Sequence, residues 1–502
     1  MAALNLKRNS AFNLIGGVIP ALAALAVVPV IVRGLGAEGY GLLVLVTSIL
    51  GYFALLDVNI TAGSTKYVAE HQARGDAHLV NQTIGFGLLV YLAIGLVGAA
   101  LLYSLSGWLA EAVFNVAPAQ HEIAAKCLKV AALGFLFGQL QIYLQSIPQA
   151  LMRYDVTSRF EVAFGLAVPL GSVVLLQAGF GLLAIVWLRV FLSLINAFLL
   201  MRSIRMLLPQ LRWEAPQRAT VRSMSSFSAY AFLSRVAALT YAHGDKLIIG
   251  AIVGMQPLAV YAVAATVGNR VLGLMYRVSA VLFPAASALA ASGDEARLKA
   301  VYLKLSRYVV YVNLSALLLL GVFAEPLLRH WIGADYSLGG ALVLQLVALG
   351  QFVDSLTNLP SLVNDGRGHP RTSGLFAITR AVLGLVAVYL LVGPFAIVGA
   401  AWGHLLSGLV MTAAFVIHVH GRTVPVSLGE LLVKSWAAPM LGATAVAVLT
   451  AWAFRHLTGS VQQLAGLVAA ATALLALYGW LVVVLPADRQ AATRWLFRRV
   501  QR

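Results

Sequence analysis

Apolar runs long enough to cross a bilayer recur along the whole chain. A transmembrane helix needs about 20 mostly apolar residues, and we count about fourteen such runs separated by short polar links. Only 11% of the residues are charged and 61% are hydrophobic, which excludes an ordinary soluble protein. The sequence therefore predicts an all-α polytopic membrane protein. The expected spans are residues 10–32, 39–56, 83–103, 126–144, 162–177, 182–200, 225–250, 257–279, 308–323, 338–356, 374–392, 397–417, 436–454 and 464–485.

The distribution of basic residues predicts which side of the membrane holds the two termini. The first run follows Lys7 and Arg8 but is too long for a signal peptide, so we expect a retained first helix. An even number of spans puts both termini on one side. About two thirds of the 35 lysines and arginines lie on that side, so the positive-inside rule places both termini in the cytoplasm. The net charge of +17 then reflects topology and attraction to anionic membrane lipid, and we expect no nucleic-acid partner.

The chain also resembles itself at nearly one offset. Gly36 recurs as Gly254 after 218 residues, and Pro148 recurs as Pro360 after 212. Two copies of six spans have the same orientation, and such folds bind their cargo between the copies. We therefore expect two six-helix pseudo-repeat lobes plus two C-terminal helices. The predicted domains are a lobe at 1–205, a basic cytoplasmic linker at 206–224, a second lobe at 225–420, two additional transmembrane helices at 421–486 and a basic amphipathic tail at 487–502.

Several short motifs point to one family. They are GLGAEGYG at residues 34–41, LLDVNITAGSTKYVAE at 55–70, DKLIIG at 245–250 with the following Tyr261, and NDGRG at 364–368. With them the chain resembles the polysaccharide-exporter (Wzx-like) branch of the multidrug/oligosaccharidyl-lipid/polysaccharide flippase superfamily. Asn59 departs from the glycine expected in an Asp-x-Gly turn. The resemblance implies export of a polyprenyl-pyrophosphate-linked glycan across a bacterial inner membrane, with the polysaccharide assembly machinery as a partner to be tested.

Cationic side chains inside the apolar spans are the candidate substrate-binding residues. A charge near the middle of a membrane helix costs about 2.5 to 3.5 kcal/mol, so a charged residue there usually has a function. Arginine makes bidentate bonds to phosphate and stays ionised when poorly hydrated, which suits an anionic pyrophosphate cargo. The alternative is internal pairing, of Asp245 with Lys246 or another neighbour and of Asp354 with Arg380 or Arg277, or snorkelling of Arg277. The candidate set is Arg235, Arg270, Arg380, Lys246, Arg277 and Arg189.

A smaller set of residues could couple transport to an ion or proton. A carboxylate inside a helical bundle takes up a proton more readily, whereas a nearby arginine opposes that change. A histidine could titrate as well. The candidates for coupling are Asp57, Asp245, Asp354 and His404.

Other function classes find little support in the sequence. Gly34, Gly36 and Gly39 spell a dinucleotide motif, but no βαβ unit surrounds them, and we expect a close turn between helices. No phosphate-binding P-loop occurs, and the lone Cys127 offers neither a disulfide nor a thiolate cluster, so we expect no cofactor or metal. The longest outward link, about 104–125, carries no evident catalytic segment, which argues against a polysaccharide polymerase or ligase. A cation-coupled multidrug or metabolite exporter of the same fold is the main alternative.

Overall fold

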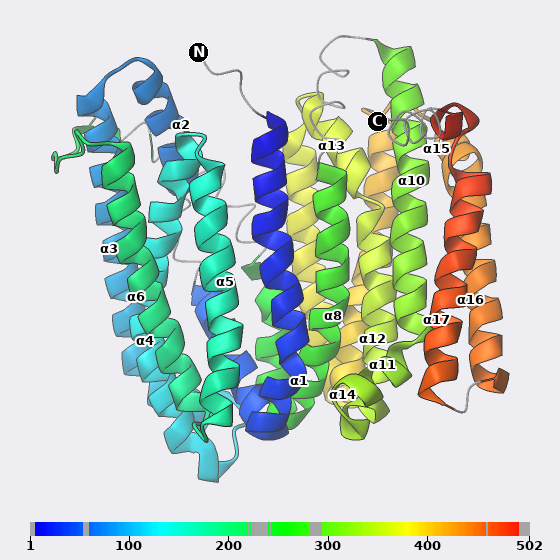
Figure 1. Ribbon diagram of the computed structural model, residues 1–502, viewed down its shortest axis with the longest axis horizontal. Helices are drawn as coiled ribbons and strands as arrows, with labels where there is room; N and C mark the ends of the chain where they lie inside the picture. The colour runs from blue at the N-terminus through cyan, green and yellow to red at the C-terminus, as the bar shows by residue number, and fades with distance from the viewer. Residues whose placement is uncertain are drawn as a thin grey trace, which may run out of the picture. The chain divides into compact units, whose positions relative to one another are not determined.

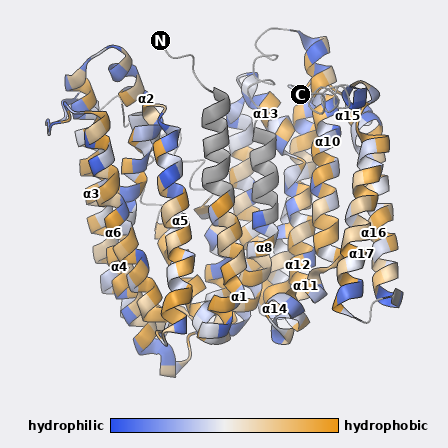
Figure 2. Cartoon of the chain, in the orientation of Figure 1, coloured by the Kyte–Doolittle hydropathy of each residue, from blue (hydrophilic) through white to orange (hydrophobic). Residues whose placement is uncertain are grey.

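The computed structural model consists of helices joined by short links. It describes residues 6–53, 60–218, 220–221, 224, 239–240, 242–280, 294–457 and 460–490, with backbone but no side chains at 6–18, 62, 271–280 and 457. Over these ranges every regular element is a helix, and ten helices are long and apolar enough to cross a membrane. Figure 2 shows hydrophobic residues predominating along their lengths. The expected all-helical membrane class is confirmed.

Contacts within the chain divide it into two compact units. The first comprises Met1–Val263 and Ala381–Ala400, and the second comprises Ala264–Arg380 and Ala401–Arg502. Two helices, α8 (Met255–Ala280) and α14 (Pro370–His420), contribute residues to both units.

Long helices form most of the first unit. Helix α3 packs against α4, α4 against α6, and α1 against α5 (Figure 1). A π-helical turn at Leu109–Val113 extends α3, and a short 3-10 turn at Pro118–Gln120 precedes α4. The helices are α1 (Leu6–Phe53), α2 (Ile60–Ala73), α3 (Ala77–Trp108), α4 (His121–Ala150), α5 (Tyr154–Gln177) and α6 (Leu182–Leu207).

In the second unit, α10 is the common neighbour of α12 and α16. The π-helical turns Leu432–Trp436 and Gly479–Val483 adjoin α16 and α17. Beside parts of α8 and α14, the helices are α10 (Glu295–Val322), α11 (Ala324–Trp331), α12 (Ala334–Ser355), α13 (Asn358–Gly366), α15 (Leu428–Leu431), α16 (Ala437–Leu457) and α17 (Val461–Tyr478).

Two of the long helices are each broken by one residue with a positive φ. Gly36 in α1 has φ 72°, and Ala396 in α14 has φ 48°. Left-handed backbone at one position ends one helix and starts another. The two breaks fall in the links expected at residues 33–38 and 393–396. Each helix therefore consists of two consecutive helical segments, 6–35 and 37–53 in α1, and 370–395 and 397–420 in α14.

Helix ends differ from the sequence expectations at two links. The longest expected outward link, 104–125, is mostly helical, because α3 and its π-helical turn continue to Val113 and a 3-10 turn begins at Pro118. The link expected after residue 56 contains helix α2, and Asp76 caps the following α3 by accepting a hydrogen bond from Leu79 N at 3.0 Å. Local hydropathy marks only the membrane-embedded part of a helix, so its polar extensions were missed.

Buried tyrosines of α3 and α4 organise the core of the first unit. The rings of Tyr91 and Tyr143 stack with centroids 5.1 Å apart, and the Tyr143 hydroxyl donates to the Ile84 carbonyl at 3.0 Å. A Cβ atom on Gly87 would lie 2.1 Å from the Tyr143 ring. The glycine thus lets the two helices approach, as small residues do at membrane-helix interfaces.

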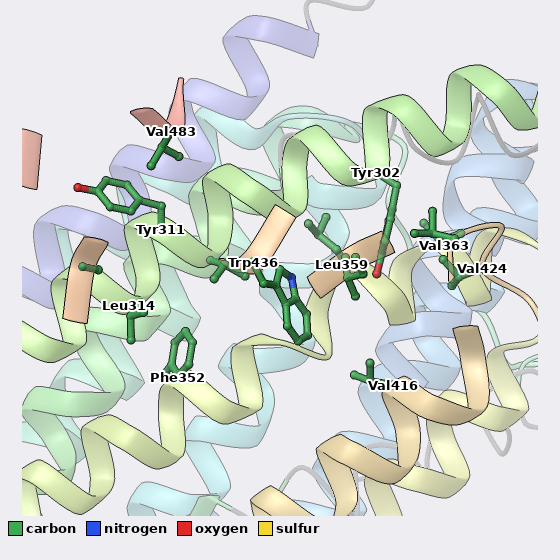
Figure 3. Close-up of a cluster of buried hydrophobic side chains, with 14 of the residues drawn as sticks. Tyr302, Tyr311, Leu314, Phe352, Leu359, Val363, Val416, Val424, Trp436 and Val483 are labelled. Atoms are coloured by element: carbon green, nitrogen blue, oxygen red, sulfur yellow. The ribbon is translucent and has the colours of Figure 1, made fainter. Parts of the chain in front are cut away.

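The core of the second unit extends along α10. Figure 3 shows Tyr311 beside Val483 toward one end, with Tyr302, Val363 and Val424 toward the other. The Tyr302 hydroxyl lies 2.9 Å from His420 Nε2 and both residues are buried, so these two polar side chains are paired within the core.

Polar contacts join α10 to the residues that follow α17. Lys304 Nζ lies 2.6 Å from Asp488 Oδ1, and the Tyr308 hydroxyl donates to Asp488 Oδ2 at 2.5 Å. The hydrogen bonds from Lys304 and then from Tyr308 lower the pKa of Asp488. Arg307 of the same helix donates to the carbonyl of Val483 at 2.9 Å. The last span is therefore held on α10 by charge as well as by packing.

Candidate functional site

A buried ion pair joins α12 and α14 in the second unit. Arg380 Nη2 lies 2.9 and 3.0 Å from the two carboxylate oxygens of Asp354, and Nε lies 3.2 Å from Oδ1. Only 12% of the Arg380 side chain and 21% of the Asp354 side chain are exposed. Arg380 lies ten residues after the start of α14, about 15 Å along the helix, so the pair is far from the helix end.

Two small residues in the second half of α14 complete this ion-pair cluster. Arg380 Nη1 donates to Ser407 Oγ at 2.9 Å, and Ser407 Oγ donates to the Gly403 carbonyl at 2.7 Å. A Cβ atom on Gly408 would lie 2.9 Å from Arg380 Nη2 and 3.3 Å from Asp354 Oδ1. The cluster thus connects α12 to both halves of α14. Because Gly408 has no side chain, there is space for the Arg380 guanidinium and the Asp354 carboxylate.

This geometry largely neutralises Arg380. A guanidinium that shares a carboxylate at such distances makes strong, charge-assisted hydrogen bonds and avoids the cost of an isolated charge in the membrane. The pairing of Asp354 with Arg380, an alternative that the sequence left open, is confirmed. For an anionic group to bind Arg380 in this conformation, it would have to compete with Asp354.

Arg270 on α8 is in a different situation. Its side chain is exposed, and no ion pair or hydrogen bond to it occurs among the residues described. The adjacent Asn269 accepts a hydrogen bond from Gln351 Nε2 at 2.5 Å, and Gln351 precedes Asp354 by one turn of α12. A polar strip of Arg270, Asn269 and Gln351 therefore lies near the ion-pair cluster in the second unit, and Arg270 has no carboxylate partner among the residues described.

The first unit holds a second charged cluster, at the start of α8 and the helix before it. Lys246 Nζ lies 3.0 Å from Asp245 Oδ1 and donates to the Ala242 carbonyl at 2.9 Å. The Tyr261 hydroxyl donates to Asp245 Oδ2 at 2.6 Å. The alternative pairing of Asp245 with Lys246 is confirmed, and Tyr261 of the family motif is buried as a hydrogen-bond donor to Asp245.

The remaining sequence candidates are scattered. Arg189 on α6 is partly buried near Tyr40, and its Nε has no hydrogen-bond partner within the described ranges. His404 lies one turn before Ser407 on α14, and its carbonyl accepts a hydrogen bond from Ser407 Oγ at 3.1 Å.

For three candidates the side chain lies outside the described part of the structure. Asp57 and Arg235 lie outside the described residues, and for Arg277 only the α8 backbone is described. No group of three or more potential metal ligands occurs among the described residues.

Sequence reasoning missed Ser407, Gly408, Asn269 and Gln351. Each is a small or neutral polar residue in an apolar helix, where single occurrences are common and carry no spacing signal. Gly408 next to Ser407 is the best available clue, because small residues mark places where helices or long side chains approach closely.

The NDGRG motif has a structural role in the second unit. Asn364 is fully buried, and its Nδ2 donates to the His369 carbonyl at 2.8 Å and to Ser373 Oγ at 3.0 Å. Its Oδ1 accepts from the Thr423 hydroxyl at 2.9 Å. Asn364 therefore ties the α13–α14 turn to the residues that follow α14.

Comparisons with known proteins agree with this architecture. A family described as polysaccharide biosynthesis protein matches residues 30–338 of the 502-residue chain. A candidate O-antigen transporter of Shigella flexneri is 21% identical over 405 residues, which cover 79% of this chain and 94% of that protein.

Two solved structures are similar in fold. The lipid II flippase MurJ, in an inward closed conformation, superposes with a TM-score of 0.74 at 12% identity, covering 93% of this chain and 98% of MurJ. An inward-facing multidrug resistance MATE family transporter of the MOP superfamily superposes with a TM-score of 0.66 at 14% identity, covering 81% and 97%.

Proposed function

We propose that this chain, which belongs to the polysaccharide biosynthesis protein family, is a flippase for a polyprenyl-pyrophosphate-linked oligosaccharide. It is a multi-pass transporter of the bacterial inner membrane rather than an enzyme. The cargo, an O-antigen, capsule or exopolysaccharide unit, moves from the cytoplasmic to the outer leaflet. The name of the Shigella flexneri relative and the fold of MurJ support this class of cargo.

The proposed architecture has fourteen spans, in two six-helix lobes followed by two helices. Two of the ten long helices are broken at Gly36 and Ala396, so each accounts for two spans. Helix α8 and the partly described helix before it supply the seventh and eighth. Gly36 and Gly254 stand at equivalent links of the proposed repeat, and both have a positive φ, of 72° and 105°. Only glycine adopts this backbone without strain, which supports a repeated helix–turn–helix unit.

The single structural observation that carries the cargo assignment is Arg270. An exposed arginine without a carboxylate partner among the described residues is costly in a membrane helix unless an anion reaches it. A pyrophosphate supplies such an anion, whereas a cationic drug would be repelled. In the proposal, Arg270 binds the pyrophosphate together with Arg235, Arg277 and Arg189, while Arg380 and Lys246 join only when their carboxylates release them.

Transport follows an alternating-access cycle in this proposal. The pyrophosphate headgroup enters between the lobes and the prenyl chain stays in the bilayer, so only the polar part needs a protein path. A ligand shifts a two-state equilibrium by its difference in affinity for the two states. Competition between the pyrophosphate and Asp354 for Arg380 gives one such difference. Asp57, Asp245 and His404 are the other proposed coupling groups. The charge distribution supports a cytoplasmic location for both termini.

The leaflet distribution of lipid-linked glycans tests the function. Cells depleted of the protein should accumulate a defined lipid-linked oligosaccharide that a membrane-impermeant probe added outside cannot reach. Re-expression of the wild type should restore labelling, and Arg270→Gln should not, although it should reach the membrane in normal amounts. Unchanged labelling after depletion, in a strain with no redundant exporter, would contradict the proposal.

A cation-coupled multidrug exporter is the second candidate, because the MATE transporter shares the fold. The two paired carboxylates, Asp245 and Asp354, are the groups that such a mechanism would use. Resistance of overexpressing cells to cationic dyes, lost in Asp354→Asn, would favour this function over the flippase.

A further inference from the structure

One exposed stripe of α6, which we assign to the lipid-facing side, changes from apolar to cationic at its end. Phe191 is 56% exposed, Ile195 46% and Phe198 67%. These residues are spaced by three or four positions and therefore share one face of the helix. The same spacing continues to Arg202 and Arg205, which are also exposed. A face that passes from large apolar residues to arginines within two turns marks where the helix leaves the hydrocarbon region.

The chain that follows α6 folds back onto the start of α3. Asn81 of α3 is 4% exposed, and its Nδ2 donates to the Gln210 carbonyl at 3.3 Å and to Glu214 Oε1 at 2.9 Å. Its Oδ1 accepts from the backbone N–H of Arg212 at 3.3 Å. One buried amide therefore fixes three positions of the loop.

A neighbouring amide holds the rest of this loop. Gln82 is 1% exposed, and its Oε1 accepts from the Thr220 hydroxyl at 3.1 Å and from the N–H of Gln217 at 3.4 Å. Gln82 Nε2 lies 2.9 Å from His78 Nε2, and His78 Nδ1 pairs with Glu214. Gly85 has no side chain to obstruct the loop, since a Cβ there would lie 2.9 Å from the Glu214 carbonyl.

The contacts with α3 hold the one acidic side chain of this loop against the helix, whereas the basic side chains are exposed. Residues 202–218 contain four arginines and a single acidic residue, Glu214. Glu214 is turned toward Asn81 and His78, and it forms no ion pair with an arginine of this loop among the residues described. Trp213 and Met206 are 63% and 66% exposed beside the arginines. The exposed arginines are Arg202, Arg205, Arg212 and Arg218, and none has an ion-pair partner among the residues described.

We propose that residues 202–218, docked on α3 by Asn81 and Gln82, form a binding surface for anionic phospholipid headgroups. The surface continues the lipid-facing stripe of α6, so its ligand belongs to the same membrane. Arginines near such a surface attract anionic lipid, and tryptophan favours the level of the headgroups. The ordered loop keeps these groups aligned, whereas a free loop would have to be ordered at the moment of binding. The surface is independent of the transported cargo.

Photo-crosslinking locates the bound lipid directly. The purified full-length protein is placed in bilayers that contain either a phosphatidylglycerol or a phosphatidylcholine probe, at equal mole fraction, with the photoreactive group in the headgroup. We expect phosphatidylglycerol to label peptides from residues 202–218 at least about fivefold more than phosphatidylcholine, since this corresponds to one arginine near the surface. Added salt should reduce this preference. Labelling concentrated elsewhere would overturn the proposal.

Three variants distinguish lipid binding by this defined surface from nonspecific attraction of lipid to a positively charged protein. Arg202→Gln/Arg205→Gln/Arg212→Gln should bring the labelling ratio of the two probes near one. Arg329→Gln/Arg455→Gln, which removes exposed arginines outside this surface, should leave the ratio at 202–218 unchanged.

The third variant tests the docking. Asn81→Leu keeps every arginine but releases the loop, and should lower the ratio severalfold. Gly85→Ala displaces the loop without removing a polar group and takes the place of Asn81→Leu if the latter fails to fold. A wild-type ratio in either the triple variant or the folded docking variant would refute the proposed surface.

Discussion

Arg380 of α14 binds both carboxylate oxygens of Asp354 on α12, at 2.9 and 3.0 Å from Nη2. Arg380 was a candidate for binding an anionic cargo and Asp354 for ion coupling, with an ion pair between them as the alternative, and in this structure the two residues form that pair. The pair therefore has two separable contributions, one to the packing of α12 on α14 and one to any step in which a phosphate replaces the carboxylate. Stability and transport measurements on the same variants distinguish these contributions.

Breaking the ion pair from one side should be costly. Asp354→Leu leaves the Arg380 charge without its carboxylate, which should destabilise the protein by about 3 to 5 kcal/mol. The double variant Asp354→Leu/Arg380→Met should recover most of this loss, because a buried ion pair and a packed apolar pair are often similar in stability. Thermal unfolding of the purified protein in detergent checks both.

Transport by the same variants decides the role of Arg380. A stable double variant that no longer exposes lipid-linked glycan on the outer leaflet would indicate that Arg380 acts on the cargo. A double variant as unstable as Asp354→Leu would contradict the expectation that a packed apolar pair can replace this ion pair.

Gly408 should be sensitive to the smallest enlargement. Gly408→Ala places a methyl group 2.9 Å from Arg380 Nη2, which should displace the guanidinium and cost about 1 to 3 kcal/mol by overpacking. Gly393→Ala on the same helix is the matched control, because a Cβ there meets nothing within 4 Å. Because alanine favours a helix more than glycine does, Gly393→Ala should not lower the unfolding temperature. An unfolding temperature that falls no further in Gly408→Ala than in Gly393→Ala would contradict a steric requirement at Gly408.

The Tyr261 hydroxyl should contribute to stability through Asp245. In Tyr261→Phe, Asp245 Oδ2 loses a donor at 2.6 Å in a buried site, which should cost about 1 to 3 kcal/mol. Tyr389→Phe is the control, since Tyr389 is 63% exposed. Thermal unfolding of the two variants gives the comparison, and a Tyr261→Phe protein as stable as the control would show that Lys246 alone compensates Asp245.

The Asp488 carboxylate should give a pH dependence at the acidic end. Lys304 and Tyr308 lower its pKa, so its contribution to stability is present above the ordinary aspartate value of about 3.9 and is lost as the pH falls through the lowered value. The difference in unfolding temperature between wild type and Asp488→Asn should be constant near neutral pH, begin to shrink as the pH approaches about 3.9, and vanish only once the pH is below the lowered pKa of Asp488. Lys304→Met should weaken the same dependence. A difference that persists in acid would contradict the assigned charge pairing.

The membrane class and most span positions follow from the sequence because hydropathy is a local property. A membrane span depends on the hydropathy summed over about 20 neighbouring residues, and a link appears where this sum falls. The breaks in α1 and α14 therefore lie in expected links. The same locality explains the error at residues 104–125. A helix that continues into the polar region keeps its backbone hydrogen bonds but loses its apolar signal, as α3 does.

The partners of the buried charges were decided by tertiary structure. The sequence offered Arg380 and Arg277 equally as partners of Asp354, and nothing in it selected Ser407 or Gly408 as neighbours. Arg380 and Asp354 are 26 residues apart on different helices, so their contact depends on how α12 packs against the two halves of α14. The sequence determined that charges would lie inside the membrane. Only the packing of helices decided which of them are neutralised, because a charge interacts through space with whatever the fold places within a few ångströms.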